Sequence, residues 1–289
     1  MGEMERDIVT VKLTPKKEAR LAMGMSSIIG TRSNQEDTIF GYVEGERAVA
    51  VVCDGMGGLS GGELASKAAA ESLAGAWFLQ KEIADIPAFL EAEAIKADEK
   101  VFLQEDASGK RLHAGTTIVA AIIRKNELYW MSVGDSKIYI VRGGEILSVC
   151  REHNYRLTLD ARLRQGEMTP EEYAAEEYRA EALISYLGMG NVSLIDVNRK
   201  PFLLEDKDIV LLSSDGLYRS LSEEEILGIL KACESDMETA AKALTAAALG
   251  EKTKGQDNTS VVILQYALTE APVAFHSRKE GKEDELKTM

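Results

Sequence analysis

The chain has 289 residues, of which 45% are hydrophobic and 28% are charged, and its 34 basic and 48 acidic residues give a net charge of −14. This length and composition are typical of one or two globular domains with a sizeable core. The excess of negative charge excludes a broad nucleic-acid-binding face, because phosphate backbones are bound by lysine and arginine.

The two ends of the chain are strongly charged. We expect residues 1–20 to be a leader without the apolar stretch of a signal peptide, and residues 268–289 to be a disordered tail. No apolar run approaches the roughly 18 residues of a membrane span. The three cysteines, Cys53, Cys150 and Cys233, show no paired spacing, which indicates reduced thiols. Together these features predict a cytoplasmic protein that does not insert into membranes.

Strands and a pair of helices are predicted in the first part of the chain. The strands cover 21–30, 38–43 and 48–54, with the last two forming a hairpin, and the helices cover 63–81 and 86–105. The run over 48–54 is apolar at almost every position, so we expect both of its faces to be buried.

A β-rich block and a helical segment follow. Four strand-like runs separated by turns lie between residues 115 and 149, and they predict an antiparallel meander. Residues 151–190 are polar and rich in glutamate, and Thr169 with Glu172 forms a capping-box pattern. We interpret residues 151–190 as an inserted helical flap.

The last part of the chain returns to strands and paired helices. Strands are predicted over 192–197, 208–215 and 258–268. Two helices precede the last strand, and each begins with a serine, Ser222 or Ser235, that is followed three residues later by glutamate. Because helices come in pairs rather than after each strand, the order favours an α+β fold over a parallel doubly wound sheet.

Aspartates stand at the ends of five predicted strands. They are Asp37, Asp54, Asp135, Asp215 and Asp257. Carboxylates that are brought together need a counter-charge, and no lysine or arginine is adjacent in sequence to Asp54, Asp215 or Asp257. Oxygen ligands favour Mg²⁺ or Mn²⁺, and a total of three histidines disfavours zinc. One aspartate beside glycine indicates only a turn, and for Asp135 that interpretation stays open.

The segment that follows the 48–54 strand, DGMGGLSGG, is rich in glycine. Two interpretations compete: its backbone N–H groups bind a phosphate, or Asp54 and a bare carbonyl bind a metal ion. The phosphate interpretation is the weaker one, because no Gly-Lys-Ser/Thr sequence follows the loop.

Six motifs over roughly residues 21–266 resemble the metal-dependent serine/threonine protein phosphatases of type 2C, and DGMGG and NQED resemble the compact bacterial type. The motifs are GTRSNQED (30–37), VVCDGMGGLSGGELAS (51–66), AGTTIVAAI (114–122), MSVGDSKIY (131–139), LLSSDGLY (211–218) and QDNTSVVIL (256–264). The resemblance implies a catalytic domain over 21–267. Its expected fold is a four-layer α-β-β-α sandwich, in which two antiparallel sheets are flanked by helix pairs and the flap is an insertion.

The resemblance also implies two tightly bound Mn²⁺ or Mg²⁺ ions. Asp54 would bridge them, and Asp215 and Asp257 would complete the protein ligands of the first ion. The backbone carbonyl of Gly55 would bind the second ion. The glycine at this position would allow the bare carbonyl to face the metal.

Four further residues receive roles from the resemblance. Glu36 and Asp37 would act through waters of the second ion. Asp135, together with Asp215, would hold a third and weaker ion. Arg32 would bind the substrate phosphate, for which the guanidinium fork is better suited than an ammonium group.

The implied reaction is hydrolysis of phosphoserine and phosphothreonine in proteins by a hydroxide that bridges the two ions. The expected partners are phosphorylated proteins and a bacterial Ser/Thr kinase whose action this monomeric enzyme opposes. Two alternatives remain: a phosphatase of one dedicated regulator, of the anti-sigma antagonist type, and a catalytically weak pseudophosphatase that acts as a binding module. The intact Asp54, Asp215 and Asp257 argue against the second alternative.

The sequence departs from the family pattern at two positions. Met56 stands where animal relatives have a histidine that is thought to protonate the leaving group, and Leu59 stands where many bacterial relatives have a histidine. These departures leave a metal-bound water as the candidate acid. His153, at the start of the flap, resembles a histidine found there in relatives. Its competing interpretation is a residue that packs the flap against the domain.

Overall fold

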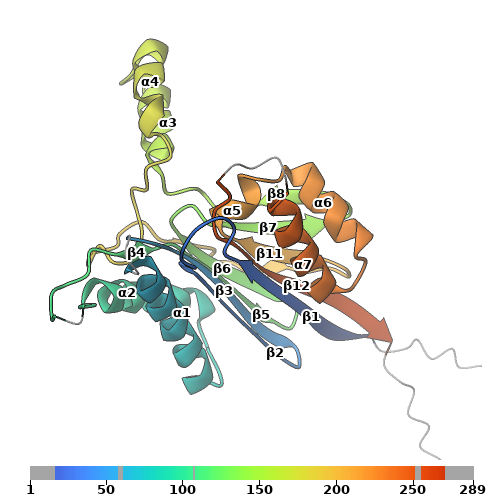
Figure 1. Ribbon diagram of the computed structural model, residues 1–289. Helices are drawn as coiled ribbons and strands as arrows, with labels where there is room; N and C mark the ends of the chain where they lie inside the picture. Colours follow the sequence, from blue (N-terminus) through green and yellow to red (C-terminus); the bar gives the residue numbers. More distant parts are fainter. Residues whose placement is uncertain (1–16, 58–60, 107, 251–254, 271–289) are drawn as a thin grey trace, which may run out of the picture.

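The computed structural model describes residues 17–57, 61–106, 108–250 and 255–270 (Figure 1). Two sheets lie face to face, and every strand pair in them is antiparallel. The α+β class and the two antiparallel sheets predicted from the sequence are thus confirmed.

The first sheet has the strand order β1-β12-β11-β7-β8. Its strands are β1 (Lys17–Ile28), β7 (Lys137–Arg142), β8 (Glu145–Ser148), β11 (Ile209–Ser213) and β12 (Thr259–Glu270). The second sheet has the order β10-β6-β5-β3-β2, and β4 and β9 pair with β3 and β6. Its strands are β2 (Asp37–Glu44), β3 (Arg47–Met56), β4 (Gly115–Thr116), β5 (Ile118–Arg124), β6 (Glu127–Val133), β9 (Asp196–Val197) and β10 (Phe202–Leu203).

The central strand β3 is buried on both faces, as its apolar run predicted. Ala50 and Val52 belong to a cluster between the two sheets, together with Leu212 and Leu264 of the first sheet. The alternate residues of β3 face the helices α1 (Gly61–Leu79) and α2 (Ile86–Phe102). This two-sided packing fixes the strand whose end carries Asp54.

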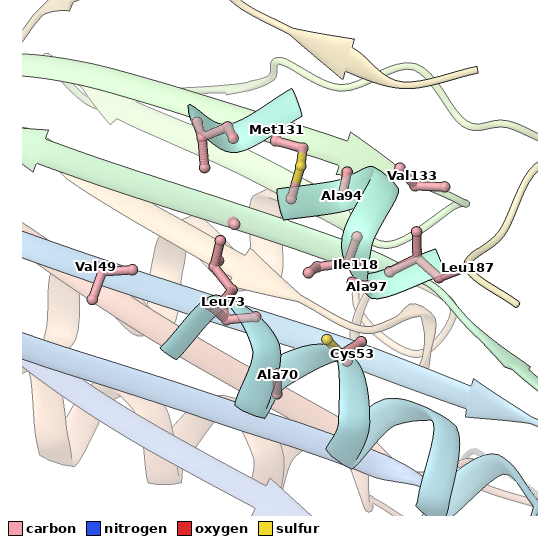
Figure 2. Packing of buried hydrophobic residues seen from close by; sticks show 14 of the residues in the cluster. Val49, Cys53, Ala70, Leu73, Ala94, Ala97, Ile118, Met131, Val133 and Leu187 are labelled. Carbon is pink, nitrogen blue, oxygen red and sulfur yellow. The ribbon is translucent and has the colours of Figure 1, made fainter. Parts of the chain in front are cut away.

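Helices α1 and α2 cover the outer face of the second sheet (Figure 1). Small residues on α1, among them Ala65 and Ala69, allow the helix to approach β3 closely, and Leu73 and Cys53 lie within the same cluster (Figure 2). A side chain larger than alanine at these α1 positions would push the helix away from the sheet.

Helices α6 (Glu223–Ala232) and α7 (Met237–Ala248) cover the other sheet, with the short α5 (Asp215–Tyr218) before them (Figure 1). The capping box of Ser222 and Glu225 is present, as predicted. The predicted cap at Ser235 is wrong by one residue, because the side chain of Asp236 accepts the hydrogen bond from the Thr239 N–H. Aspartate caps as well as serine does, so the local pattern alone did not separate them.

The flap stands away from the sheets (Figure 1) and contains α3 (Tyr155–Arg164), α4 (Pro170–Glu176) and a 3₁₀ turn, η1 (Glu177–Arg179). The predicted capping box of Thr169 and Glu172 is present at the start of α4. Leu159, Met168 and Ala180 form a small buried cluster within the flap, separate from the clusters of the sandwich.

The predicted meander over residues 115–149 is wrong. β5 pairs with β6 and β7 pairs with β8, but the chain crosses from one sheet to the other between β6 and β7. This crossing places Asp135, in the connection, at the end of both sheets. The strand predicted over 192–197 is reduced to the two residues of β9.

The sheet extends beyond the boundaries expected for the catalytic domain. β1 and β12 pair from Lys17↔Glu270 to Ile28↔Thr259, so the first sheet reaches into the expected leader and the expected tail. The remaining parts of those two segments, 1–16 and 271–289, lie outside the described residues.

Candidate metal centre

Strand pairing brings the predicted aspartates to one end of the two sheets. Asp37 at the start of β2 is directly opposite Asp54 on β3. Asp215 follows the end of β11, and Asp257 precedes the start of β12, which pairs with β11. Asp135 lies in the crossing between the sheets. Residues spread over more than 200 positions of the chain thus meet because antiparallel neighbours begin and end at the same edge.

A hollow of about 440 Å³ lies at this edge, and seven of the eight predicted site residues line it. They are Arg32, Glu36, Asp54, Gly55, Asp135, Asp215 and Asp257. Asp37 lies behind the hollow and is 7% exposed. Glu181 and Leu183, from the returning segment of the flap, and Arg219, after α5, complete the lining relevant to the chemistry.

Asp54 is held in place through its backbone. Its N–H donates to Thr117 Oγ1 at 3.0 Å, and its carbonyl accepts from the Thr117 N–H at 2.8 Å and from Thr116 Oγ1 at 2.9 Å. The Thr117 hydroxyl is in turn hydrogen-bonded to Ser136 Oγ at 2.7 Å. These contacts leave the carboxylate itself available to a ligand.

Gly55 is required by close backbone packing. A Cβ at this position would lie 2.1 Å from the Gly62 carbonyl oxygen at the start of α1 and 2.6 Å from that of Glu36. Gly57 has a φ of 143°, which side-chain-bearing residues rarely adopt. Gly55 therefore permits the end of β3 to lie close to the start of α1, directly beside Asp54.

Asp37 carries a half-satisfied buried carboxylate. Its Oδ2 accepts a hydrogen bond from Ser214 Oγ at 2.8 Å, whereas its Oδ1 has no hydrogen-bond partner among the described residues. Burial raises the pKa of Asp37 to about 7, against hydrogen bonds from Ser260 and Ser214 that lower it. Such a group favours either a proton or a nearby cation.

The neighbouring carboxylates show the same excess of negative charge. Burial, followed by repulsion from Asp37 and Asp215, raises the pKa of Asp54 well above its ordinary value. Burial and repulsion from Asp215 raise the pKa of Asp135 to about 6. The pKa of Asp215 is also raised, by burial, although the charge of Arg219 opposes the shift.

Two arginines supply part of the counter-charge of the aspartates. The sequence, which has no lysine or arginine adjacent to Asp54, Asp215 or Asp257, did not predict this. Arg32 Nη2 lies 2.6 Å from Asp257 Oδ2. Arg219 Nε lies 3.0 Å from Asp215 Oδ2, and its Nη2 lies 3.6 Å from Asp135 Oδ2. Arg219 is not adjacent in sequence to any of the aspartates, but its i,i+4 spacing from Asp215 is a signal that the sequence does contain.

The donor set fits a hard divalent cation, because the acidic side chains that line the hollow offer carboxylate oxygens and Asp37, behind the hollow, keeps a buried oxygen without a hydrogen-bond partner among the described residues. Within the described ranges, however, no three Asp, Glu, His or Cys residues form a group ready to hold one ion. The raised pKa values of Asp37, Asp54 and Asp135 nevertheless indicate negative charge that the two guanidinium groups leave uncompensated.

Sequence reasoning missed the side chains that shape the loop before β2. Asn258 accepts the Glu36 N–H at 2.7 Å and donates to the carbonyls of Ile29 and Asn34 at 2.8 and 3.0 Å. Its position directly after Asp257 was the available signal. The loop that carries Arg32 and Glu36 is thus held by the start of β12.

The structure shows where two of the three residues noted in comparison with the family, Met56 and His153, lie relative to the hollow. Met56 lines the hollow, whereas Leu59 lies outside the described residues. His153 is fully buried at the base of the flap, where its Nδ1 accepts the Gly134 N–H at 3.2 Å and its Nε2 lies 3.4 Å from Asp196 Oδ2. His153 therefore packs the flap against the domain and does not face the hollow.

A site that combines oxygen ligands with guanidinium groups is suited to phosphoryl transfer, in which charge on the phosphoryl oxygens must be neutralised. The fold and the hollow together define a phosphate-ester hydrolase. In line with this class, a family model described as protein phosphatase 2C matches residues 24–252.

Relatives and solved structures agree with that match. The serine/threonine phosphatase stp of Listeria welshimeri serovar 6b is 31% identical over 222 residues, which cover 75% of this chain and 84% of the relative. The serine/threonine phosphatase of S. agalactiae has a TM-score of 0.71 at 27% identity, covering 85% of this chain and 99% of that one. The catalytic domain of the phosphatase PstP, solved with 2 manganese ions, has a TM-score of 0.68 at 26% identity, covering 86% and 99%.

The chain belongs to the protein phosphatase 2C family, in its compact bacterial type, and is a protein serine/threonine phosphatase. The family and the activity predicted from the six motifs are confirmed. Across the part of the chain that the structure describes, no helix is both long and apolar enough to cross a membrane.

Proposed function

We propose that the hollow hydrolyses phosphoserine and phosphothreonine with the help of two Mn²⁺ or Mg²⁺ ions. Asp54, Asp215 and Asp257 would supply carboxylate ligands and Gly55 its carbonyl, with Glu36 and Asp37 acting through water. The observation that carries this proposal is the convergence of four strand-end aspartates on one hollow, with Asp37 directly behind it. Burial and mutual repulsion raise the pKa values of Asp37, Asp54 and Asp135.

Manganese is the metal bound in the related PstP structure, and the oxygen donors of this chain suit it equally. When bound, such ions activate a water for attack on phosphorus and neutralise charge on the phosphoryl oxygens. The chain itself must hold the carboxylates in position both before and after the ions bind. The backbone contacts of Asp54 with Thr116 and Thr117 do this.

Arg32 is proposed to bind the substrate phosphate. Its side chain is 56% exposed at the rim of the hollow, and its partner Asp257 is also partly exposed. A guanidinium group in this position can turn from Asp257 to a phosphate, because surface ion pairs are weak and a phosphate offers two oxygens to the fork.

The leaving-group proton has no histidine donor in the hollow, since Met56 occupies the position where one would be expected. Water ordered by the acidic side chains is therefore the proposed acid. The third, weaker ion between Asp135 and Asp215 stays a prediction, and Arg219 offers a competing way to neutralise the same two carboxylates.

We propose that the catalytic unit is the four-layer sandwich with the inserted flap over 151–190, extended at its ends to β1 and β12, and that it works as a monomer. Its substrates are phosphorylated proteins, and it would oppose a Ser/Thr kinase. Glu181 and Leu183 place the returning segment of the flap at the hollow, so substrate selection by the flap is supported. The dedicated-regulator and pseudophosphatase alternatives remain as outcomes of the test.

The test is hydrolysis of a phosphothreonine peptide by the purified full chain. Excess chelator should silence turnover, and added Mn²⁺ should restore it. Restored turnover of unrelated phosphopeptides supports a general phosphatase, whereas turnover limited to one regulator supports the dedicated form. Metal binding without turnover of any phosphoprotein would identify a pseudophosphatase, and full turnover in excess chelator would overturn the metal mechanism.

A further inference from the structure

Arg219 contacts both of the carboxylates to which the family resemblance assigns a third metal ion. Its Nε lies 3.0 Å from Asp215 Oδ2 and its Nη2 lies 3.6 Å from Asp135 Oδ2. Asp135 and Asp215 are mostly buried, with side chains 7% and 14% exposed, whereas the Arg219 side chain is 47% exposed and lines the same hollow. The guanidinium group thus lies over the outer side of the two carboxylates.

The position of Arg219 is set by the turn that precedes it. Asp215 begins α5, and Arg219 caps its end, so the i,i+4 spacing directs the guanidinium back to Asp215. Tyr218 Oη donates to the Asp135 carbonyl at 3.1 Å, which ties α5 to the crossing between the sheets. Both carboxylates are therefore within reach of one arginine.

The other cation close to this crossing is engaged elsewhere. Lys137 Nζ lies 2.7 Å from Glu152 Oε1 and 3.9 Å from the centre of the Tyr218 ring. Among the described residues, Arg219 is the cation with an ion pair to Asp135 or Asp215.

A guanidinium group is permanently charged and planar, and it can donate to two carboxylates at once. A divalent ion between Asp135 and Asp215 would have to displace this group or bind against its positive charge. Arg219 contacts Asp215 through Oδ2. The Asp215 carboxylate is also within hydrogen-bond reach of Asp54, which is the position for an ion shared by these two residues. The two-ion centre and the arginine are therefore compatible.

We propose that Arg219 takes the place of the third metal ion in this phosphatase, so that its centre consists of two ions and one fixed guanidinium group. This inference rests on the two-ion mechanism proposed above. Arg219 acts here as a charge-balancing and positioning residue for Asp135 and Asp215. Because its charge does not depend on free metal, the enzyme gains no further ion or activity in millimolar Mn²⁺ once two ions are bound.

The test counts and locates Mn²⁺ in the full chain by equilibrium dialysis with metal analysis and by anomalous scattering from crystals soaked in millimolar Mn²⁺. The native chain should hold two ions. Arg219→Ala should hold a third beside Asp135, and the double variant Arg219→Ala with Asp135→Asn should return to two. Arg219→Lys, which keeps the charge, and Arg199→Ala, which removes an arginine paired with Glu91 outside the hollow, should both hold two.

Activity gives an independent readout. At low Mn²⁺, Arg219→Ala should lose kcat by roughly a hundredfold, the lower end of the cost of removing one charge-stabilising donor. Part of this loss should be recovered at millimolar Mn²⁺, when an ion occupies the vacated place. A third ion beside Asp135 in the native chain, or a count of two for well-folded Arg219→Ala, would overturn the proposal. If Arg219→Ala folds poorly, the native chain and Arg219→Lys decide the matter. Failure of the two-ion mechanism looks different, since the native chain would then bind no ion in the hollow.

Discussion

The strand-end hollow and the flap both contain many carboxylates, but they compensate the charge differently. In the flap, Glu176 lies 3.4 Å from Arg162 and Glu181 lies 2.8 Å from Arg156, on partly or fully exposed surfaces. At the hollow, Asp37 and Asp54 lie directly opposite each other, and both have raised pKa values. Among the described residues, neither forms an ion pair with an arginine. The hollow therefore retains negative charge for a ligand, whereas the flap neutralises its own.

The two regions also differ in what supports them. The hollow lies at the end of strands packed on both faces by large clusters. The flap's own hydrophobic cluster has three buried residues, and the surface ion pairs around it contribute little each. We therefore expect that removing a carboxylate from the hollow lowers activity without unfolding the domain. Substitutions in the flap should instead change the stability of the flap and the choice of substrate.

The largest difference should follow from matched aspartate substitutions. Asp54→Asn should reduce kcat by at least roughly a thousandfold, more than the loss of a single hydrogen-bond donor, because it removes the carboxylate that is proposed to be shared by the two ions. Asp160→Asn in the flap, whose carboxylate accepts from Tyr173 Oη at 2.9 Å, should keep turnover of p-nitrophenyl phosphate near the native level. Melting in chelator should show that Asp54→Asn is at least as stable as the native chain, because repulsion falls. Near-native kcat for Asp54→Asn would contradict the role of this residue.

Matched arginine substitutions should separate phosphate binding from surface charge. Arg32→Ala should raise KM for a phosphopeptide by roughly tenfold or more, the effect of losing a charge-assisted hydrogen bond, with a smaller change in kcat. Arg162→Ala in the flap, which loses only its contact with Glu176, should leave KM for p-nitrophenyl phosphate unchanged. A fall in kcat at constant KM for Arg32→Ala would instead show that Arg32 acts only in the transition state.

Matched leucine substitutions should show that the flap is a separate unit of stability. Leu212 lies between the sheets and Leu159 lies in the flap, and both are fully buried. Leu212→Ala should lower the free energy of unfolding of the whole domain by about 2–5 kcal/mol. Leu159→Ala should leave the main calorimetric transition almost unchanged and should increase protease cleavage within residues 155–179. An equal loss of melting temperature for both variants would show that the flap and the sandwich unfold together.

The smallest effects should be opposite slopes of stability with pH. The folded pKa of Asp37 is about 7, against an ordinary value of 3.8. The folded, chelated protein therefore holds the extra proton between these values, and its stability should fall as pH rises through this window. Asp37→Asn should flatten that slope in melting curves.

Asp196, at the base of the flap, should show the reverse. Burial would raise its pKa, but the hydrogen bonds and charge of Arg151, together with His153 Nε2 at 3.4 Å, outweigh burial and hold the pKa well below 3.8. Its stabilising contribution is present above pH 3.8 and should be lost as pH falls below that value. Asp196→Asn should remove acid sensitivity of the flap, measured by proteolysis, and an unchanged profile would contradict this assignment.

Much of the fold was available in the sequence because it depends on local patterns. The apolar run of β3 predicted a strand buried on both faces, and the boxes at Thr169 and Ser222 predicted two helix starts. These features depend on side-chain periodicity and on hydrogen bonds within three residues. The aspartates at strand ends, together with the motif order, also identified the residues that meet at the hollow.

Only the tertiary structure decided how distant segments pair. Between β6 and β7 the chain crosses from one sheet to the other. The sequence does not predict this crossing, because the alternation of side chains within each strand would be the same in a single meander. Arg32 contacts Asp257 and Asn258 contacts Glu36 across more than 220 positions of the chain. The sequence therefore could not determine which carboxylates are neutralised by an arginine. The electrostatic environment of each carboxylate depends on groups that only folding brings near it.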